Sequence, residues 1–184
     1  KITNCEDPTY YLKSIKNKIE IENMKKAHIK DGVALTKFLF WIKQYKNFGF
    51  DELTLEKKLE KFRKQSKDYI YPSFNTIAGS GPNSAIRHYR SSEKTNRKIK
   101  RDDIFLCDSG GQYKYGTTDV TRTVCFKEPS KRIKNIFTRV LKGHIAVATN
   151  NLNKIKKGNL IDKKARASLN KVNLDYGHGT GHGV

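Results

Sequence analysis

The sequence predicts an α+β fold, in which helices pack in layers against strands. Apolar residues first recur at helical spacing, within residues 16–62. A stretch rich in Tyr, Ile, Phe and Thr follows over residues 68–80, strand-like segments continue up to residue 126, and helical spacing returns after residue 129. This order of helices, strands and helices favours an α+β layer fold. The 184 residues, 36% of them hydrophobic, are sufficient for one globular domain or for part of a larger one.

The first part of the chain is predicted to be helical. Residues 16–46 form one long helix, or two helices that meet near Asp31. This segment has an apolar stripe at positions i, i+3, i+4 and i+7, which consists of Leu35, Phe38, Leu39 and Ile42. The stripe is interpreted as core packing. Thr54 is predicted to be the N-cap of a second, shorter helix.

The remaining elements follow from turn residues and from β-forming composition. Residues 68–80 are predicted to be a strand, because they are rich in β-branched and aromatic residues and end in a Gly-Ser-Gly-Pro turn. Residues 103–126 are predicted to form a β-hairpin. The other expected segments are an extended piece at 85–89, a polar connection at 91–101, helices at 129–150 and 162–169, and a glycine-rich end at 174–184.

The basic charge is interpreted as a property of solvated surfaces. Lys and Arg number 38 against 18 Asp and Glu, which gives a formal net charge of +20. Of these basic residues 29 are Lys, and they are spread over the predicted helices rather than interleaved with exposed aromatic residues. Binding to nucleic acid is therefore not expected. No run of ~18 apolar residues occurs, so no membrane span is predicted either.

The three cysteines predict a reduced protein in the cytoplasm. Cys5, Cys107 and Cys125 form no CxxC motif and no Cys/His ligand pattern. Widely spaced thiols in an odd number are typical of cytosolic proteins. Cys107 and Cys125 lie in apolar, strand-like runs, where Cys acts as a small buried hydrophobe. No catalytic role is expected for them.

Two aspartates in the predicted hairpin are candidate metal ligands. A turn centred at Tyr113–Lys114 would place Asp108 opposite Asp119, with their Cβ atoms ~5 Å apart. Two carboxylates so placed repel each other in a partly buried site, and a divalent cation between them removes that cost. Carboxylate oxygens suit hard metal ions. The alternative is a pair of turn or edge aspartates in water.

Histidines mark two further segments. In residues 177–183 glycine alternates with other residues, which disfavours a helix. As a strand, this segment would direct His178, Thr180 and His182 to one face, with the two imidazoles ~13 Å apart and therefore unable to bind the same metal ion. The alternative is a flexible tail. His88 lies in a short run, residues 84–89, where a lone His is more often a structural hydrogen-bonding residue.

Taken together, these segments resemble the Xaa-Pro aminopeptidase (aminopeptidase P) family, a branch of the pita-bread metallopeptidases. The motifs that carry the resemblance are Ala-Ile-Arg-His-Tyr at 85–89, Asp-Ser-Gly-Gly-Gln-Tyr with Gly-Thr-Thr-Asp-Val-Thr-Arg-Thr over 108–123, and His-Gly-Thr-Gly-His-Gly-Val at 178–184. The resemblance implies an incomplete pita-bread fold, with a curved antiparallel sheet covered by helices. It assigns residues 16–184 to the N-terminal part of the catalytic domain and residues 1–15 to the end of a preceding linker or domain.

The resemblance also implies a site with two divalent metal ions, most commonly manganese. Asp108 matches the first carboxylate ligand, Asp119 the carboxylate that bridges both metals, and His182 the imidazole ligand. His88 and His178 match the histidines that line the substrate cleft. The implied reaction removes the N-terminal residue from peptides with proline at the second position.

Two glutamate ligands of the family, which follow the His-Gly-Thr-Gly-His motif, are not in this sequence. The chain alone is therefore expected to be inactive and to need the complementary C-terminal half of the domain. A homodimer is compatible with the full-length protein, and a membrane partner is not expected. The alternative is a non-catalytic pita-bread module that binds peptide or nucleic acid, although such relatives lose the metal ligands.

Overall fold

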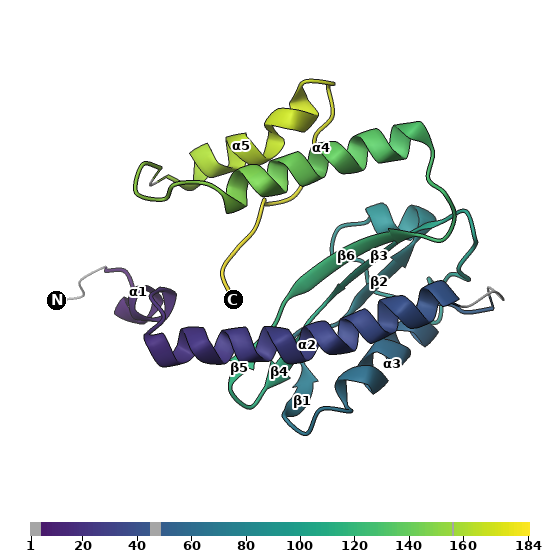
Figure 1. Cartoon of the computed structure of the whole chain (residues 1–184), viewed down its shortest axis with the longest axis horizontal. Helices are drawn as coiled ribbons and strands as arrows, with labels where there is room; N and C mark the ends of the chain where they lie inside the picture. The colour runs from purple at the N-terminus through teal and green to yellow at the C-terminus, as the bar shows by residue number, and fades with distance from the viewer. Residues whose placement is uncertain (1–4, 45–48, 156) are drawn as a thin grey trace. The chain divides into compact units, whose positions relative to one another are not determined.

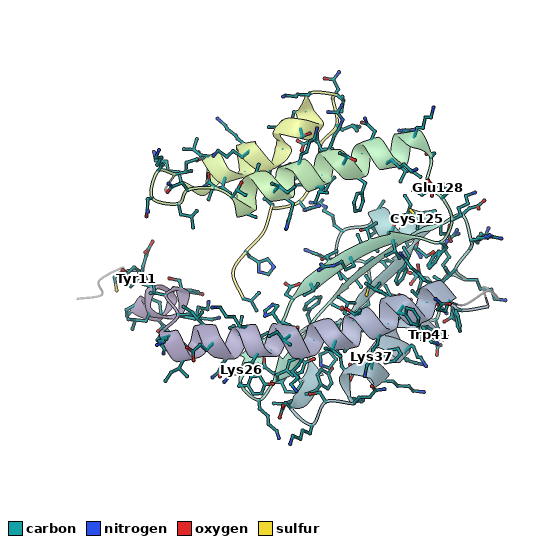
Figure 2. All side chains as sticks on the ribbon, in the orientation of Figure 1. Tyr11, Lys26, Lys37, Trp41, Cys125 and Glu128 are labelled. Carbon is teal, nitrogen blue, oxygen red and sulfur yellow. The ribbon has the colours of Figure 1, made fainter. Side chains whose placement is uncertain are left out.

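The computed structural model describes residues 5–44, 49–155 and 157–184. The chain divides into two compact units. The first unit comprises Lys1–Lys127 together with Gly183–Val184, and the second comprises Glu128–His182. In Figure 2, Cys125 marks the end of the last strand of the first unit and Glu128 the beginning of the second. None of the helices in the described ranges is both long enough and apolar enough to cross a bilayer.

The first unit begins with two helices, α1 (Pro8–Ser14) and α2 (Lys18–Gln44). The start of α2 is a reciprocal capping box, in which the Glu20 amide donates to the Asn17 side chain and the Asn17 amide donates to the Glu20 carboxylate. α2 is one unbroken helix, so the alternative of two helices meeting near Asp31 is wrong. The predicted end of this helix, at residue 46, lies outside the described residues.

Helix α3 (Glu52–Arg63) lies beside α2 (Figure 1). Its N-cap is Asp51, whose carboxylate accepts a hydrogen bond of 2.8 Å from the Thr54 amide. The prediction that Thr54 is the cap is therefore wrong. Asp51 has an extended backbone (φ −115°, ψ 172°), which lets its side chain fold back over the first helical turn, whereas Thr54 already lies inside the helix.

Strands β2 (Ile77–Ser80), β3 (Ile104–Ser109) and β6 (Val120–Cys125) form an antiparallel sheet in the order β2-β3-β6. Burial alternates along β3, and Phe105, Cys107 and Ser109 are its buried residues. This period of two indicates that one face of the sheet is covered. The predicted pairing of the two ends of residues 103–126 is confirmed, because β3 and β6 are hydrogen-bonded neighbours.

A second small sheet has the order β1-β4-β5 and consists of β1 (Tyr69–Pro72), β4 (Gly111–Tyr113) and β5 (Gly116–Thr117). The prediction of a single strand over residues 68–80 is wrong, because β1 and β2 belong to different sheets. Ser73 directly follows β1. Its amide donates to the Gly110 carbonyl, and its hydroxyl donates to the Thr118 carbonyl.

Helices α2 and α3 cover the buried face of the β2-β3-β6 sheet (Figure 1). The apolar core joins the predicted stripe of α2 to the strands, and it comprises Leu35, Phe38, Ile42, Leu55, Leu59, Ala78, Ile99, Phe105 and Cys107. Lysines lie on the outer surface of α2, where Lys26 and Lys37 are exposed (Figure 2). The predicted core packing of the α2 stripe is confirmed.

The second unit contains helices α4 (Lys131–Ala148) and α5 (Gly158–Asn170), which pack side by side (Figure 1). Both predicted helices are confirmed, although α5 begins earlier than expected. Gly143 permits the close approach of the two helices, because a Cβ atom there would lie 2.2 Å from the Ala165 carbonyl oxygen.

A buried ion pair connects the helices of the first unit to its strands. Arg63 Nε lies 2.7 Å from Asp31 Oδ1, and Arg63 Nη2 donates both to Asp31 Oδ2 (3.0 Å) and to Ser109 Oγ (3.0 Å). The Tyr113 hydroxyl donates to Asp31 Oδ1 at 2.9 Å. Both charged side chains are at most 1% exposed. Burial works against the charge of Arg63, but the contacts with Asp31 outweigh it and raise the pKa of the guanidinium.

We expect Asp31→Asn to destabilise the chain strongly, because it leaves the Arg63 charge buried without a counter-charge. The expected loss in free energy of unfolding is about 3–5 kcal/mol, measured by urea denaturation at pH 7. Lys64→Ala is the matched control, since it removes a solvent-exposed pair with Glu60 and should cost less than about 1 kcal/mol. Equal losses for the two variants would contradict a structural role of the buried pair.

Candidate metal centre

The β3–β6 ribbon positions both candidate aspartates, but not in the predicted register. Asp108 pairs with Thr121, and Ser109 pairs with Val120. The turn lies one residue later than expected, because Tyr113 still belongs to β4 and pairs with Gly116. Tyr113 is fully buried and its hydroxyl is bound to Asp31, so it is held in the strand and not in the turn. The predicted direct pairing of Asp108 with Asp119 is therefore wrong.

The observed register places both aspartates near the same end of the β3–β6 ribbon. Asp108 lies on the face of β3 opposite to the one that carries Phe105 and Cys107. Asp119 directly precedes Val120, the first residue of β6, and therefore lies outside the ladder. Strand alternation consequently does not determine the face to which the Asp119 side chain points.

A sharp bend in the ribbon lies between the two aspartates. Gly110 and residues 118–119 lie outside the strands, at the point where the chain passes from one sheet to the other. A Cβ atom at Gly110 would lie only 1.8 Å from the Thr118 carbonyl oxygen, so a side chain does not fit there. The bend therefore depends on a glycine directly beside the candidate ligands.

Asp108 carries an unsatisfied buried atom. Its Oδ1 atom is inaccessible to solvent and has no hydrogen-bond partner within the described part of the chain. Other carboxylates of the first unit are well supplied with donors. Asp103, for example, accepts from the Ser80 hydroxyl, the Arg97 guanidinium and the Lys100 amide. A buried carboxylate oxygen without a partner is costly, and a cation is one way to satisfy it. The donor type thus fits a hard divalent metal ion.

His88 lies in a turn and not in an extended piece. The predicted strand-like segment at 85–89 is replaced by a 3₁₀ helix, η1 (Gly81–Ala85), and a turn, in which His88 has φ +52°. Such a left-handed backbone is strained for a residue with a side chain. The next residue, Tyr89, is 6% exposed, and its hydroxyl donates to Glu52 at 2.6 Å.

Glu52 organises the surroundings of this turn. Its buried carboxylate accepts hydrogen bonds from the Ser80 amide (2.8 Å), the Asn83 side chain (3.1 Å) and the Arg97 amide (3.1 Å), in addition to the Tyr89 hydroxyl. One side chain at the start of α3 thus holds the end of β2, the helix η1 and the segment after His88. Burial and the contact with Glu52 raise the pKa of Tyr89.

The glycine-rich segment forms no strand. Residues 177–184 are all described and have neither helical nor strand structure, so the prediction that His178, Thr180 and His182 share one face of a strand is wrong. The segment has no strand pairing, and one of its carbonyl groups, that of His178, is instead bound by a side chain. Arg166 donates to the His178 carbonyl at 2.8 Å, and the His178 ring stacks on Tyr176 with centroids 4.7 Å apart.

The candidate residues are distributed over both units. His88, Asp108 and Asp119 belong to the first unit, whereas His178 and His182 belong to the second. Within the described ranges, no group of three or more His, Cys, Asp or Glu side chains is gathered in a metal-binding arrangement. The two candidate aspartates therefore belong to the same ribbon, whereas the candidate histidines belong to other segments.

The three cysteines, Cys5, Cys107 and Cys125, are free thiols. Cys107 is 1% exposed, and burial raises the pKa of its thiol to about 11, so it stays protonated at neutral pH. The prediction that it acts as a buried hydrophobe is confirmed.

Three buried charged residues that support the site were not recognised in the sequence as such. Asp31, Glu52 and Arg63 lie within the helices, in line with the apolar stripes that face the core. Asp31 is four residues before Leu35, and Glu52 is three residues before Leu55. A charged residue at a core position of an amphipathic helix is the signal that could have identified them.

Comparisons with known proteins identify relatives for nearly the whole chain. Residues 22–184 match the model of metallopeptidase family M24. An Xaa-Pro aminopeptidase of Drosophila melanogaster is 48% identical over 175 residues, which cover 94% of this chain and 28% of that protein. A probable Xaa-Pro aminopeptidase P of Laccaria bicolor is 46% identical, with 99% of this chain and 29% of that protein covered. The chain thus spans about three tenths of the length of these relatives.

Solved structures agree with these relatives. The X-prolyl aminopeptidase of Caenorhabditis elegans, described as a cytosolic enzyme with a di-nuclear active site, matches with a TM-score of 0.85 and 38% identity, over 94% of this chain and 29% of that one. An Xaa-Pro dipeptidase of Bacillus anthracis matches with a TM-score of 0.82 and 29% identity, over 95% of this chain and 47% of that one. The predicted α+β pita-bread fold is confirmed, and the sheets present here are a small part of it.

The left-handed backbone at His88 has a measurable consequence for stability. We expect His88→Gly to be more stable than His88→Ala by about 0.5–1 kcal/mol, because only glycine adopts φ +52° without strain. Urea denaturation of both variants measures the difference. The control is Lys26, an exposed position within α2, where Ala should be the more stable residue by about 1 kcal/mol. If the Gly and Ala variants ranked in the same order of stability at both positions, this would contradict a strained turn at His88.

Proposed function

We propose, because the chain belongs to metallopeptidase family M24, that it forms the N-terminal part of the catalytic domain of a metal-dependent aminopeptidase. The proposed enzyme releases the N-terminal residue from peptides whose second residue is proline. This specificity is supported by relatives at 46–48% identity that are named as Xaa-Pro aminopeptidases. Because the chain covers only part of each relative, the activity is a proposal for the larger protein. Residues 16–184 would be the catalytic part and residues 1–15 the end of what precedes it.

The unpartnered oxygen of Asp108 is the observation that carries this proposal. It gives the ribbon an acceptor that the described residues leave unsatisfied, and Asp119 lies at the same end of the ribbon, directly before β6. We propose that Asp108 and Asp119 are carboxylate ligands of two divalent cations, most suitably manganese, and that His182 is the imidazole ligand. The two carboxylates would supply anionic oxygen ligands of the kind that hard divalent cations prefer.

In the proposed reaction, this chain's own residues hold the site and orient the peptide. The bound cations would supply the positive charge that activates a water molecule and polarises the peptide carbonyl. Asp108 and Asp119 would fix the geometry from the rigid ribbon. His88 and His178 would direct their ring N–H groups at the carbonyl of the scissile bond, where negative charge develops. Neither histidine needs to be a metal ligand for this role.

The remaining ligands are proposed to come from the complementary C-terminal half of the domain. Two glutamates from that half would complete the coordination, and this chain alone would then be inactive. A larger protein is consistent with a chain that covers 28–29% of its first relatives. A cytoplasmic location is also proposed, with support from the free thiols and from the cytosolic neighbour. A homodimer remains compatible with the full-length protein.

The alternative is a pita-bread module that binds peptide or nucleic acid without catalysis. The net charge of +20 is the feature in its favour. Against it, both aspartates of the proposed site are retained, and a module without metal would have no use for an unpaired carboxylate at Asp108. We therefore favour the metallopeptidase.

Replacement of Asp108 should weaken metal binding specifically. We expect Asp108→Asn to lower the affinity of the chain for Mn²⁺ at least about tenfold, because the amide lacks the anionic oxygen. Isothermal titration and the Mn²⁺ electron paramagnetic resonance signal measure this affinity. Asp102→Asn is the matched control, since Asp102 is 72% exposed and pairs with Lys127 on the surface. Equal affinities for the two variants would remove Asp108 from the site.

The reaction itself is tested with the chain and the C-terminal half of the domain together. We expect cleavage of a peptide with proline at position two and not of the same peptide with alanine there. A chelator should abolish the activity and Mn²⁺ should restore it, whereas Asp108→Asn should not be restored. Metal-independent cleavage, or equal cleavage of both peptides, would refute the proposed function.

A further inference from the structure

Arg166 on α5 binds the segment that carries His178. Its Nε donates to the Asp162 carboxylate at 3.0 Å, one turn earlier on the same helix. Its Nη1 donates to Asp175 Oδ1 (2.8 Å) and to the Tyr176 carbonyl (2.7 Å), and its Nη2 donates to the His178 carbonyl (2.8 Å). Four of the five guanidinium donors are thus used, three of them on the chain that follows the helix.

Aromatic contacts extend this arrangement. The Arg166 guanidinium lies 4.0 Å from the centroid of the Tyr176 ring, and the other contact of that ring is His178. The Tyr176 hydroxyl lies 2.7 Å from the Thr180 hydroxyl, which in turn donates to Asp162. We name this set the Arg166 cluster, and it consists of Asp162, Arg166, Asp175, Tyr176, His178 and Thr180.

The glycine-rich segment, residues 177–182, depends on such contacts for its order. It has no helical or strand structure, and a Cβ atom at Gly177, Gly179 or Gly181 would meet nothing within 4 Å. Glycines in open space lose a large amount of backbone freedom when the chain is ordered. The two hydrogen bonds from Arg166 to the Tyr176 and His178 carbonyls restrict the backbone on both sides of Gly177. Stacking on the Tyr176 ring restricts the His178 side chain.

The charges of the cluster support a persistent contact. The hydroxyl of Thr180 and the guanidinium of Arg166 lower the pKa of Asp162, and Arg166 together with the Tyr176 amide lowers the pKa of Asp175. Both carboxylates are therefore ionised at neutral pH on either side of the guanidinium. A lysine would keep the positive charge but would lack the planar fork that reaches two carbonyls and a carboxylate at once.

We propose that Arg166 is a positioning residue that orders residues 177–182, so that His178 and His182 are presented in one fixed arrangement. The part of this inference that concerns metal and peptide rests on the proposed function. The ordering of the segment stands on the contacts alone. Arg166 would not touch substrate or metal and would act through the backbone that carries the two histidines.

The test compares two arginines of the same unit. Arg166→Lys is the informative variant. Arg139→Lys is the control, because Arg139 also donates to a carbonyl, that of Ser168 at 2.8 Å, but its second hydrogen bond goes to Asn135 on its own helix and not to the glycine-rich segment. Backbone ¹⁵N relaxation of the metal-free chain gives the order parameters of Gly177, Gly179 and Gly181. The ring-proton shifts of His178 report its stacking on Tyr176.

In the wild-type chain and in Arg139→Lys we expect order parameters of about 0.8, and in Arg166→Lys values below about 0.6. The upfield shift of the His178 ring should disappear only in Arg166→Lys. Equal behaviour of the two variants would overturn the inference. If Arg166→Lys loses helical circular dichroism, Arg166→Gln takes its place, because it removes the Nη donors that reach the Tyr176 and His178 carbonyls. An unchanged segment in that variant would likewise overturn the inference.

Metal binding separates this inference from the proposed function. We expect Arg166→Lys to weaken Mn²⁺ binding about tenfold and Arg139→Lys to leave it unchanged. If residues 177–182 become mobile in Arg166→Lys but the Mn²⁺ affinity is unchanged, the proposed link between Arg166 and the metal site is refuted. A wild-type chain that binds no Mn²⁺ would refute the proposed function, and the order parameters would still decide whether Arg166 orders the segment.

Discussion

The register of the β3–β6 ribbon depends on one buried carboxylate. Asp31 of α2 binds Arg63, which also binds Ser109 at the end of β3, and Asp31 accepts directly from Tyr113 in β4. The two contacts lie on either side of the bend at Gly110 and hold the ribbon at both ends of it. A slip of one residue would turn each side chain to the other face of the sheet. It would direct Asp108 into the apolar core and leave Asp31 and Arg63 without their partners.

Strand β3 serves two environments because its side chains alternate. Phe105, Cys107 and Ser109 face the helices, where the apolar core and the buried ion pair hold them. Asp108 faces the other way, where no donor meets its Oδ1 atom in the described residues. The fold does provide donors elsewhere, since Glu52 accepts hydrogen bonds from several groups at once. The missing partner is therefore a local property of the ribbon face that carries Asp108.

Much of this arrangement follows from local sequence, but the register does not. The apolar stripe of α2, the burial of Cys107 and the pairing of β3 with β6 are all contained in short-range patterns. The turn at residues 114–115 has no Asn-Gly or Asp-Gly signal, and its position is decided by a contact between Tyr113 and Asp31, 82 residues away. The cap of α3 was misplaced for a similar reason, because Asp51 and Thr54 are both good cap residues and only the backbone of Asp51 distinguishes them. A glycine-rich segment likewise resembles a strand in sequence, and only the lack of a partner strand reveals the difference.

The two candidate cleft histidines are held in the same way, although they belong to different units. Neither lies in a helix or strand, so no ladder of backbone hydrogen bonds fixes it. Each has a tyrosine close by in sequence, and that tyrosine is bound to a charged residue at a helix. Tyr89 follows His88 and donates to Glu52, whereas Tyr176 precedes His178 by two residues and stacks beneath Arg166. A ring anchored at its polar end restricts the neighbouring backbone at a small cost in side-chain entropy, since it has only two rotatable bonds. Loops can therefore present functional side chains as reproducibly as strands, provided that a helix supplies the charged group at the base of each loop.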